Sequence, residues 1–277
     1  MKKSIRSTNP GFMPSSAEVS KDIEVYQSFA VALAKKAGFF LYKNFGNVKK
    51  IEEKKFKESV TDIDKKSEDI VISAIRKKFP DHDILSEEKG SMGKKSDYLW
   101  VIDPLDGTHN YIARIPIYGV SISLCFREKP IVGAIYLPHV KEMYEAGIKK
   151  GAYLNKKRIR VSGIESLEDS FILTETGCNV KLEEKIRNLR FIAKKAGRIR
   201  VLGSLVFQLS YLASGRIEGV VSETGKPWDY AAGSLIVEEA GGKVTDFKGG
   251  ESTIREGYML ATNGKIHNQL LKLLNFK

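Results

Sequence analysis

Two aspartates near the middle of the chain, Asp103 and Asp106, have residue types and a spacing suited to holding a cation. They lie in the segment Y-L-W-V-I-D-P-L-D-G-T-H-N-Y (residues 98–111), in which no Lys or Arg falls between Trp100 and Ile112. Neighbouring carboxylates without a local basic partner favour a bound metal ion, and hard oxygen ligands suit Mg²⁺, Mn²⁺ or Ca²⁺. By itself the segment is equally consistent with a surface turn, because Asp, Pro and Gly also dominate turns for conformational reasons.

A strand that ends in a stiff turn is expected to position these two aspartates. Residues 98–102 are apolar, aromatic or β-branched, which is typical of a buried strand, and the run stops at Asp103. Pro104 holds Asp103 extended, while Gly107 permits a tight turn before a segment that can open as a helix. The sequence therefore predicts Asp103 and Asp106 on one short turn at the end of a strand.

Further acids lie elsewhere in the chain, and each has a simple structural alternative. Asp64 falls in the first turn of a predicted helix, where an acid also complements the helix dipole. Glu87 and Glu88 follow a predicted short strand and offer a third carboxylate. Asp229 opens a predicted helix after a Pro-Trp pair, a place where Asp serves as an N-cap without any metal. Together with Asp103, Asp106 and Glu87, Asp229 can instead complete one acidic pocket.

The first part of the chain is predicted to contain helices followed by an antiparallel sheet. Residues 1–20 lack apolar periodicity and are expected to form a mobile tail. Apolar residues at helical spacing predict core-packing helices over 21–45 and, capped by Thr61 or Asp62, up to Pro80. Strands are predicted over 84–88, 119–126, 131–137, 143–148 and 152–154, with a flexible loop over 89–93.

The second part alternates strands and helices, which indicates a layered α/β half. Strands are predicted over 171–174, 198–202, 217–221, 244–245 and 258–261, and helices over 182–196, 204–213, from 227 to the Gly-Gly pair at 241–242, and 265–274. We therefore divide the chain into the tail (1–20), an N-terminal α+β subdomain (21–161) with most of the candidate metal ligands, and a C-terminal α/β subdomain (162–277) with Asp229 and the substrate contacts.

The composition indicates an ordinary globular protein. Its 277 residues are 42% hydrophobic, enough to bury a sizeable core. No apolar run is long enough to span a bilayer, and the start M-K-K-S lacks the apolar core of a secretory signal, so we expect a cytoplasmic protein without a membrane partner. Two cysteines, Cys125 and Cys178, are too few for a disulfide framework. The sequence contains no zinc-ligand spacing, P-loop or dinucleotide-binding motif.

The charge balance favours anionic partners. Lys and Arg number 46 against 34 Asp and Glu, which gives a net charge of +12. Phosphate esters, nucleic acid or anionic lipid would suit this charge. The lysines are scattered in pairs, however, as on a solvated surface, so nucleic-acid binding is left open and not favoured.

Taken together, D-P-L-D-G-T-H-N-Y, W-D-Y-A-A-G-S-L-I-V-E-E-A-G-G, T-D-I-D upstream of a helix, and S-E-E resemble the inositol monophosphatase family, part of the wider group of lithium-sensitive, Mg²⁺-dependent sugar phosphatases. The resemblance extends from about residue 21 to the end of the chain. It implies a five-layered αβαβα sandwich and a phosphate monoesterase that uses two or three Mg²⁺ ions per active site. It also implies a homodimer.

The resemblance assigns roles to individual residues. The implied metal ligands are Glu87, Asp103 and the Leu105 carbonyl for a first Mg²⁺, and Asp103, Asp106 and Asp229 for a second. Asp64 and Thr108 correspond to the pair that orients and deprotonates the attacking water. Two divalent ions about 3.5–4 Å apart would stabilise both the attacking and the leaving oxygen of an in-line displacement. Each of these residues thereby receives a chemical role.

The implied substrate contacts fall in both halves of the chain. Asp106 and the backbone N–H groups of Gly107 and Thr108 are expected to face the phosphate, and Gly203 and Ser204 to contact the alcohol portion. Glu223 is a further candidate, although the family glutamate that binds sugar hydroxyls falls one residue earlier, at Ser222. A slip of one residue turns a strand side chain to the opposite face, so Glu223 is not assumed to substitute.

Two further positions are implied by the resemblance alone. A family serine corresponds to about Cys178. The charged segment 49–58 is consistent with a solvated helix, a β-ribbon or a mobile flap, and our working prediction is a flap that helps position a third metal or the attacking water.

The leading hypothesis is a Mg²⁺-dependent phosphatase that hydrolyses a small phosphate monoester, with inositol 1-phosphate as the default substrate. Fructose 1,6-bisphosphate is the first alternative, followed by 3′-phosphoadenosine 5′-phosphate or NADP. The segment G-S-L-V-F-Q-L lacks the G-S-S-L-K-like pattern of nucleotidases with this fold. The remaining alternative is a non-catalytic RNA- or protein-binding module, against which the clustered acids argue, because without metal they would repel one another.

Overall fold

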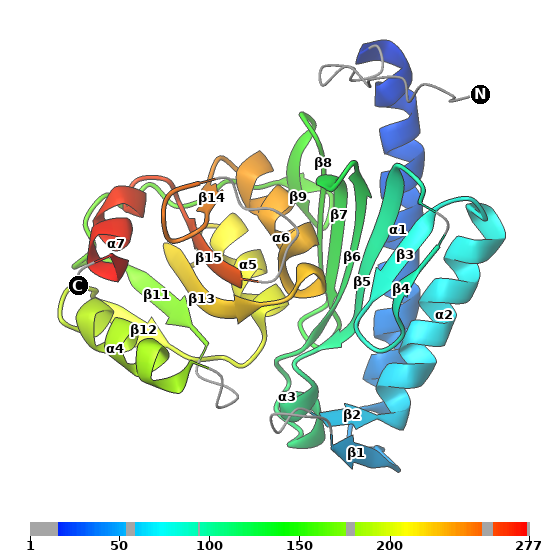
Figure 1. Cartoon of the computed structure of the whole chain (residues 1–277), viewed down its shortest axis with the longest axis horizontal. Coiled ribbons are helices and arrows are strands. Elements are labelled where there is room, and N and C mark those ends of the chain that lie inside the picture. Colours follow the sequence, from blue (N-terminus) through cyan, green and yellow to red (C-terminus); the bar gives the residue numbers. More distant parts are fainter. Residues whose placement is uncertain (1–15, 54–58, 94, 176–180, 251–256, 276–277) are drawn as a thin grey trace, which may run out of the picture.

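The computed structural model describes residues 16–53, 59–93, 95–175, 181–250 and 257–275, with side chains from residue 22 onward (Figure 1). The helices are α1 (Ser16–Asn44), α2 (Asp62–Lys78), α3 (Thr108–Ile112), α4 (Leu182–Ala193), α5 (Leu205–Ala213), α6 (Pro227–Glu239) and α7 (His267–Leu274). The strands are β1 (Ile51–Glu53), β2 (Ser59–Thr61), β3 (Asp83–Ser86), β4 (Gly90–Met92), β5 (Tyr98–Asp106), β6 (Gly119–Phe126), β7 (Lys129–Leu137), β8 (Glu142–Gly147), β9 (Gly151–Leu154), β10 (Lys157–Arg158), β11 (Phe171–Thr174), β12 (Arg198–Arg200), β13 (Gly219–Gly225), β14 (Lys243–Thr245) and β15 (Gly257–Thr262).

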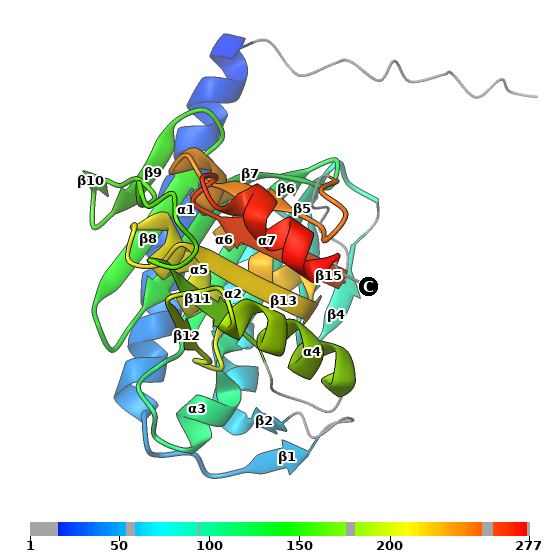
Figure 2. The same cartoon turned by 90° about the vertical axis from the view of Figure 1, so that its left-hand side faces the viewer.

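Helices and sheets alternate in layers (Figures 1 and 2). Helices α1 and α2 cover one face of an eight-stranded sheet, whose strand order is β10-β9-β8-β7-β6-β5-β3-β4. Helices α5 and α6 fill the space between this sheet and a five-stranded sheet of order β12-β11-β13-β15-β14. Helices α4 and α7 cover the outer face of the second sheet, as Figure 2 shows. The predicted αβαβα layering is therefore confirmed.

The two sheets differ in strand direction. All described pairings of the eight-stranded sheet are antiparallel except that of β3 with β5, which is parallel. In the five-stranded sheet β11 runs parallel to both β12 and β13, whereas β15 is antiparallel to its neighbours β13 and β14. Each sheet thus contains a parallel pair whose carboxyl ends can open onto a ligand site.

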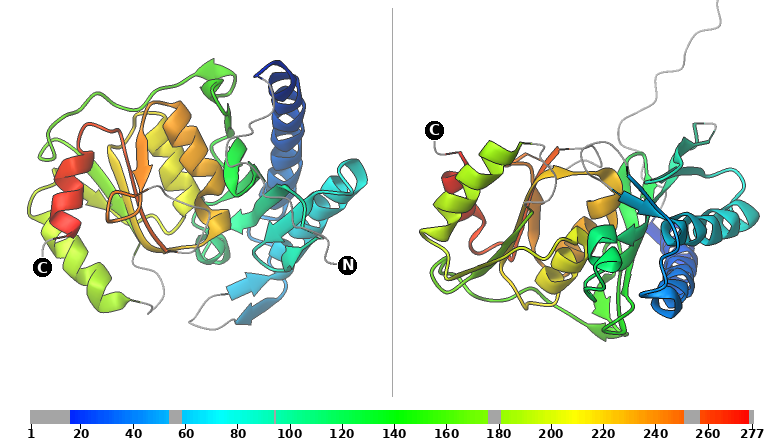
Figure 3. Two further views of the ribbon diagram at one scale, coloured as in Figure 1. Left: turned by 45° about the horizontal axis from the view of Figure 1, so that its top comes forward. Right: turned by 90° about the horizontal axis from the view of Figure 1, so that it is seen from below.

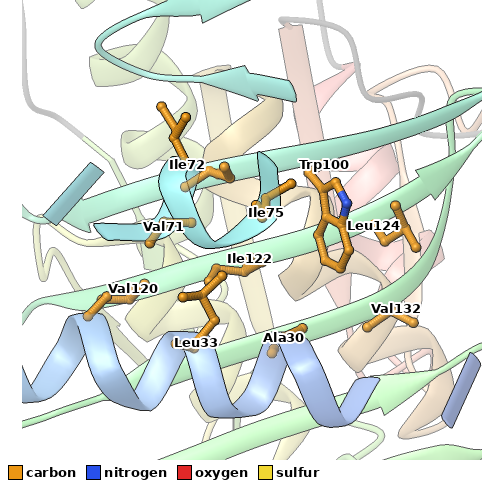
Figure 4. Packing of buried hydrophobic residues seen from close by; sticks show 14 of the residues in the cluster. Ala30, Leu33, Val71, Ile72, Ile75, Trp100, Val120, Ile122, Leu124 and Val132 are labelled. Carbon is orange, nitrogen blue, oxygen red and sulfur yellow. The ribbon is translucent and has the colours of Figure 1, made fainter. Parts of the chain in front are cut away.

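Apolar side chains of the first helices explain the packing of the first two layers (Figure 4). Ala30 and Leu33 of α1 and Ile75 of α2 are almost completely buried against the eight-stranded sheet. Trp100 of β5 is fully buried, and its ring stacks on Phe79 with centroids 5.6 Å apart. Removal of this apolar surface from water fixes the orientation of β5, the strand that carries the central acids.

Several element boundaries differ from the sequence prediction. Strand β5 continues to Asp106, because a bulge between Asp103 and Asp106 lets the strand pass Pro104, which has no N–H for the ladder. The expected loop at 89–93 contains β4, which pairs with β3. Helix α1 already begins at Ser16, and residues 1–15 of the predicted tail lie outside the described residues. The predicted division of the chain at residue 161 stays a prediction.

The segment 49–58 is described only in part. Strand β1 pairs with β2 in an antiparallel ribbon beside α3 (Figures 1 and 3), while residues 54–58 lie outside the described residues. Asp62 ties this ribbon to α2, since its Oδ1 accepts hydrogen bonds from the backbone N–H groups of Lys49 at 3.1 Å and Lys50 at 3.2 Å. Of the three forms considered for this segment, its described part adopts the β-ribbon.

Candidate active site

Three carboxylates meet where β5 approaches the first turn of α6. Oxygen atoms of Asp103, Asp106 and Asp229 all lie within 4.8 Å of one another. Asp103 pairs with Ser121 of β6, and the Ser121 hydroxyl donates to the Trp228 carbonyl at 3.2 Å, one residue before Asp229. The register of β5 on β6 therefore brings the acids of the first half next to the acid of the second.

Asp229 is not the N-cap of its helix. The N-cap of α6 is Lys226, and Asp229 is the third residue after it, with Oδ2 accepting a hydrogen bond from the Lys226 backbone N–H at 2.8 Å. One oxygen of Asp229 thus satisfies the helix start. The N-cap interpretation of Asp229 is therefore wrong, and its Oδ1 is not used by this contact with the Lys226 N–H.

The bulged end of β5 is fixed by hydrogen bonds to its backbone. The Leu105 N–H donates to Asp103 Oδ1 at 3.0 Å, and Ser67 of α2 donates to the Pro104 carbonyl at 2.9 Å. The Leu105 carbonyl oxygen lies 3.0 Å from the Thr108 hydroxyl, within hydrogen-bond distance. These contacts hold Asp103 and Asp106 in one arrangement, as metal ligands require.

Burial raises the pKa values of all three carboxylates, and the charge of neighbouring acids adds to the shift of Asp103 and Asp229. For Asp103, burial is the largest cause of the upward pKa shift, followed by the charge of Glu87. Burial raises the pKa of Asp106 to about 6. Burial also raises the pKa of Asp229, with the charge of Asp106 as the next cause. Positive charge placed among these acids would be strongly stabilised, because each is desolvated beside the others.

Glu87 reaches this cluster from the end of a neighbouring strand. Ser86, the last residue of β3, pairs with Ile102 of β5 in the parallel ladder, so Glu87 lies beside Asp103. Glu87 does not belong to the group of described acids whose oxygens meet within 4.8 Å, although its charge acts on Asp103. The structure therefore places Glu87 at the edge of the cluster.

Sequence reasoning missed the residue that holds the turn after Glu87. Glu68 of α2 is fully buried, and its Oε1 accepts hydrogen bonds from the backbone N–H groups of Glu88 and Lys89 at 3.1 Å each. The only sequence signal was the spacing of Glu68 from Asp64, which suggests a shared helix face. Burial of that face was decided by packing.

Asp64 and Thr108 are brought together in a hydrogen-bonded pair. The Thr108 hydroxyl lies 2.9 Å from Asp64 Oδ1 and donates its single proton either there or to the Leu105 carbonyl. Thr61, the N-cap of α2, holds the other oxygen of Asp64 through its backbone N–H at 2.9 Å and through its hydroxyl. Burial raises the pKa of Asp64, while these hydrogen bonds oppose the shift.

Gly107 joins β5 to α3 in a left-handed conformation that favours glycine. Its φ is 86°, and a Cβ at this position would stand 2.8 Å from the Ile117 carbonyl oxygen and 3.3 Å from Ser204 Cβ. This turn brings Thr108 back over the end of β5. The predicted role of glycine in a tight turn is confirmed, and the phosphate contacts of the Gly107 and Thr108 N–H groups stay a prediction.

Asp106 is tied to the start of α5. Its Oδ2 accepts hydrogen bonds from the hydroxyl of Ser204, the N-cap of α5, and from the Val206 backbone N–H at 3.1 Å. Asn110 supports the same loop by donating to the Leu202 carbonyl at 2.7 Å and to the Gly203 carbonyl at 3.3 Å. The predicted contact residue Ser204 therefore acts directly on Asp106.

The remaining predicted substrate contacts are dispersed. Glu223 is fully buried, and its Oε1 accepts from Asn188 of α4 at 2.9 Å, so the structure does not bring it into the acid cluster. Cys178 lies outside the described residues. A carboxylate that sequence reasoning missed, Glu175, follows β11, and its pKa is raised first by burial and next by the charge of Asp106.

The donor set of the cluster fits a hard divalent cation. Aspartate carboxylates converge within one ion's reach, and the Leu105 carbonyl lies on the same bulged turn. Mg²⁺ prefers oxygen ligands of this kind and is commonly held by few carboxylates. These residues can therefore bind divalent metal beside the Asp64–Thr108 pair.

Among the described helices, none is both long and apolar enough to cross a membrane.

Comparison with known proteins agrees with this geometry. The chain matches the model of the inositol monophosphatase family over residues 22–277. A fructose-1,6-bisphosphatase/inositol-1-monophosphatase of Thermotoga maritima is 37% identical over 248 residues, which cover 89% of this chain and 94% of the relative. The Nus factor SuhB of Haemophilus influenzae is 38% identical over 252 residues, covering 88% and 93%. The crystal structure of the extragenic suppressor protein SuhB from Bartonella henselae matches with a TM-score of 0.85 at 34% identity, covering 89% of this chain and 96% of that one.

Proposed function

This chain belongs to the inositol monophosphatase family of phosphatases, and from that premise we propose that it is a Mg²⁺-dependent phosphatase whose substrate is inositol 1-phosphate. The observation that carries the proposal is the convergence of Asp103, Asp106 and Asp229 beside the hydrogen-bonded pair of Asp64 and Thr108. A metal-binding cluster next to a buried base is the arrangement that hydrolysis of a phosphate ester needs.

Two or three Mg²⁺ ions would be held by the cluster. The proposed ligands are Asp103, Asp106, Asp229, Glu87 and the Leu105 carbonyl. When bound, such ions neutralise charge on the phosphoryl oxygens and lower the pKa of a water molecule. The β1–β2 ribbon is the proposed flap that helps position a third metal or the water.

Asp64 and Thr108 handle the proton of the attacking water. With its own proton donated to Asp64 Oδ1, the Thr108 hydroxyl keeps lone pairs that accept a hydrogen bond from water and so orient it. Asp64 takes up the proton, and burial suits it to this task by raising its pKa above that of an exposed carboxylate. Thr61 keeps the Asp64 carboxylate in one rotamer.

The substrate contacts follow from the same end of β5. The N–H groups of Gly107 and Thr108 are proposed to bind the phosphate, and Gly203 to approach the alcohol. Ser204 fixes Asp106 between metal and substrate. The hydroxyl-binding role considered for Glu223 gains no support from its position against α4.

Phosphate release from a panel of esters tests this proposal. The panel contains inositol 1-phosphate, fructose 1,6-bisphosphate, 3′-phosphoadenosine 5′-phosphate and NADP, each assayed with Mg²⁺ and with EDTA. We expect Mg²⁺-dependent release, fastest with inositol 1-phosphate. Faster release from fructose 1,6-bisphosphate would favour the first alternative, which the name of the Thermotoga maritima relative supports. No release from any ester by folded, Mg²⁺-supplied protein would refute the phosphatase proposal.

A basic surface favours nucleic-acid binding as a second candidate function. Six exposed basic residues lie on α4, the turn after it and the outer strand β12: Arg187, Arg190, Lys194, Lys195, Arg198 and Arg200. Such a surface attracts a phosphate backbone. The relative named Nus factor SuhB gives this candidate added support.

Salt-dependent binding of a single-stranded RNA oligonucleotide, followed by fluorescence anisotropy, tests this second candidate. We expect a triple substitution of Arg190, Lys194 and Arg198 by Ala to weaken binding and its salt dependence while phosphate release is unchanged. Asp103→Asn should abolish phosphate release and leave RNA binding and its salt dependence unchanged. Equal RNA binding by wild type and the triple variant would exclude this surface.

A homodimer is proposed from the family, and exposed apolar side chains offer a place for its interface. Phe39 and Tyr42 of α1 are 56% and 45% exposed, and Val140 is 43% exposed. The Tyr42 ring contacts His139 with centroids 5.6 Å apart, which joins the helix to the loop that carries Val140. Size-exclusion chromatography with light scattering measures the molar mass of the assembly. We expect a dimer for wild type and a monomer for Phe39→Lys.

A further inference from the structure

Glu175 lies at the edge of the five-stranded sheet that faces the metal cluster. It directly follows β11, which runs parallel to β13 with Leu173 opposite Val220 and Thr174 opposite Val221. Asp229 lies just beyond the end of β13. The carboxyl ends of neighbouring parallel strands open onto the same crevice, so Glu175 and Asp229 border one space.

The alternation of β11 turns Glu175 towards α5 and α6. Leu173 packs in the core cluster formed with these helices, whereas Ile172 packs in the cluster with α4 and α7. Because strand side chains alternate between faces, Glu175 follows Leu173 onto the inner face. Its partner confirms this, since Gln208 of α5 donates through Nε2 to Glu175 Oε1.

Glu223 shows the opposite arrangement on the neighbouring strand. Val221 packs with α4 and α7, and Glu223 two residues later meets Asn188 of α4. Of the half-buried Glu175 and the buried Glu223 at this end of the sheet, only Glu175 therefore faces the helical layer in which the acid cluster is completed.

Gln208 connects Glu175 to the residue that holds Asp106. It lies one helical turn after Ser204, whose hydroxyl donates to Asp106. Gln208 is fully buried, and its Oε1 has no hydrogen-bond partner among the described residues. The donation from Gln208 Nε2 to Glu175 therefore comes from a buried and fixed side chain, and it sets the position of the Glu175 carboxyl group.

Glu175 is a neighbour of the metal cluster and not a member of it. Among the described acids, the group whose oxygens meet within 4.8 Å contains Asp103, Asp106 and Asp229 without Glu175. Burial raises the pKa of Glu175 to about 8, and the charge of Asp106 is the next cause. The carboxyl group thus lies near the acid cluster and outside the group of described acids that could share one metal ion.

We infer that Glu175, positioned by Gln208, accepts hydrogen bonds from hydroxyl groups of the alcohol portion and thereby selects polyol phosphates over phosphate esters without hydroxyls. The inference rests on the proposed phosphatase activity and names a specificity residue for it. A carboxyl group suits this role because its two oxygens can meet neighbouring hydroxyls of a polyol. An ester without hydroxyls makes no hydrogen bond to Glu175, so substitution of Glu175 should not slow its hydrolysis.

The test compares Glu175→Gln with wild type on inositol 1-phosphate and on p-nitrophenyl phosphate, which has no hydroxyl beside the ester. We expect kcat/KM for inositol 1-phosphate to fall about 10- to 100-fold and that for p-nitrophenyl phosphate to stay within about twofold. The inhibition constant of free myo-inositol against p-nitrophenyl phosphate hydrolysis should rise, and that of inorganic phosphate should not. Glu175→Ala provides a second variant and should show the same split.

Glu218→Gln is the matched control. Glu218 is also buried in this strand pair, where its carboxylate accepts from the Phe171 backbone N–H at 2.7 Å, but it lies at the opposite end of β13. Its substitution should leave the ratio of the two kcat/KM values unchanged. Equal losses on both esters, or no loss on either, in Glu175→Gln would overturn the inference while the phosphatase proposal stands. A wild-type protein that hydrolyses neither ester overturns both.

Discussion

Gly133 sets how closely the helix that carries Asp229 approaches the eight-stranded sheet. It lies on β7, where a Cβ would stand 2.7 Å from the Ala232 carbonyl oxygen and 3.2 Å from Ala232 Cα of α6. Ordinary contacts begin at 3.4 Å, so Gly133→Ala requires about 0.7 Å of separation, the difference between these distances. Asp229 is one turn before Ala232 and would move with the helix.

Helix α6 has little room to retreat. On its other side Gly233 packs against Leu209 of α5 so closely that a Cβ there would stand 2.8 Å from Leu209 Cβ. Overpacking of this kind costs about 1–3 kcal/mol of unfolding free energy. Active sites tolerate displacements of a catalytic group up to about 0.5 Å, and a displacement of about 1 Å lowers the rate up to about 100-fold. For Gly133→Ala we therefore expect a loss of about 2 kcal/mol and at least about a tenfold fall in kcat.

Urea unfolding followed by circular dichroism, together with Mg²⁺-dependent release of phosphate, measures both effects. Gly163→Ala is the control, because a Cβ at Gly163 meets no heavy atom within 4 Å and its backbone is not in the left-handed region. If Gly133→Ala and Gly163→Ala agree within about 0.5 kcal/mol, the range of surface substitutions, and within about twofold in kcat, Gly133 does not set the position of α6.

Three further predictions concern charge, helix capping and pH. Asp103→Asn should raise the Tm of protein in EDTA, because it removes repulsion among desolvated acids, and should abolish both phosphate release and the rise in Tm on adding Mg²⁺. Ser204→Ala should lower stability by about 1 kcal/mol through loss of the α5 N-cap and should weaken Mg²⁺ binding measured by calorimetry, since Asp106 loses a donor. Burial lowers the pKa of His267 from 6.5 to about 4, so the unfolded chain takes up this proton first and stability falls as the pH drops from 6.5 to about 4, by at most about 3 kcal/mol. Unfolding of His267→Gln across this range should lack that component.

Each of these predictions has a control or a contradicting outcome. An Asp103→Asn protein with wild-type Tm in EDTA would show that the acids do not strain the metal-free fold. Ser214→Ala changes a hydroxyl at the other end of α5 and should leave Mg²⁺ affinity intact. His267 lies between the hydroxyls of Thr245 and Thr262, each 2.9 Å from a ring nitrogen. If the difference in unfolding free energy between wild type and His267→Gln did not change with pH, the His267 ring would be charged in the folded protein.

Features with a local physical cause followed from the sequence. The segment from Asp103 to Thr108 combines an apolar run, a proline and a glycine, and their backbone preferences act within a few residues. The αβαβα layering was identified through family motifs and agrees with the hydrophobic periodicity of the helices. The bulge that extends β5 to Asp106 was not foreseen, because it arises from pairing with β6.

Features that depend on contacts between distant segments were decided by the tertiary structure. Gln208 carries no distinguishing local signal, and the hydrogen bonds of Glu68 and Ser204 appear only when α2 and α5 pack against strand ends remote in sequence. The sequence predicted a metal site, through the spacing of Asp103 and Asp106 and, for Asp229 and Glu87, through the family resemblance. Which glutamate faces the site, Glu175 and not Glu223, was determined only by the register of β11 on β13 and by the helices on each face, because a strand alternates its side chains whatever their chemistry.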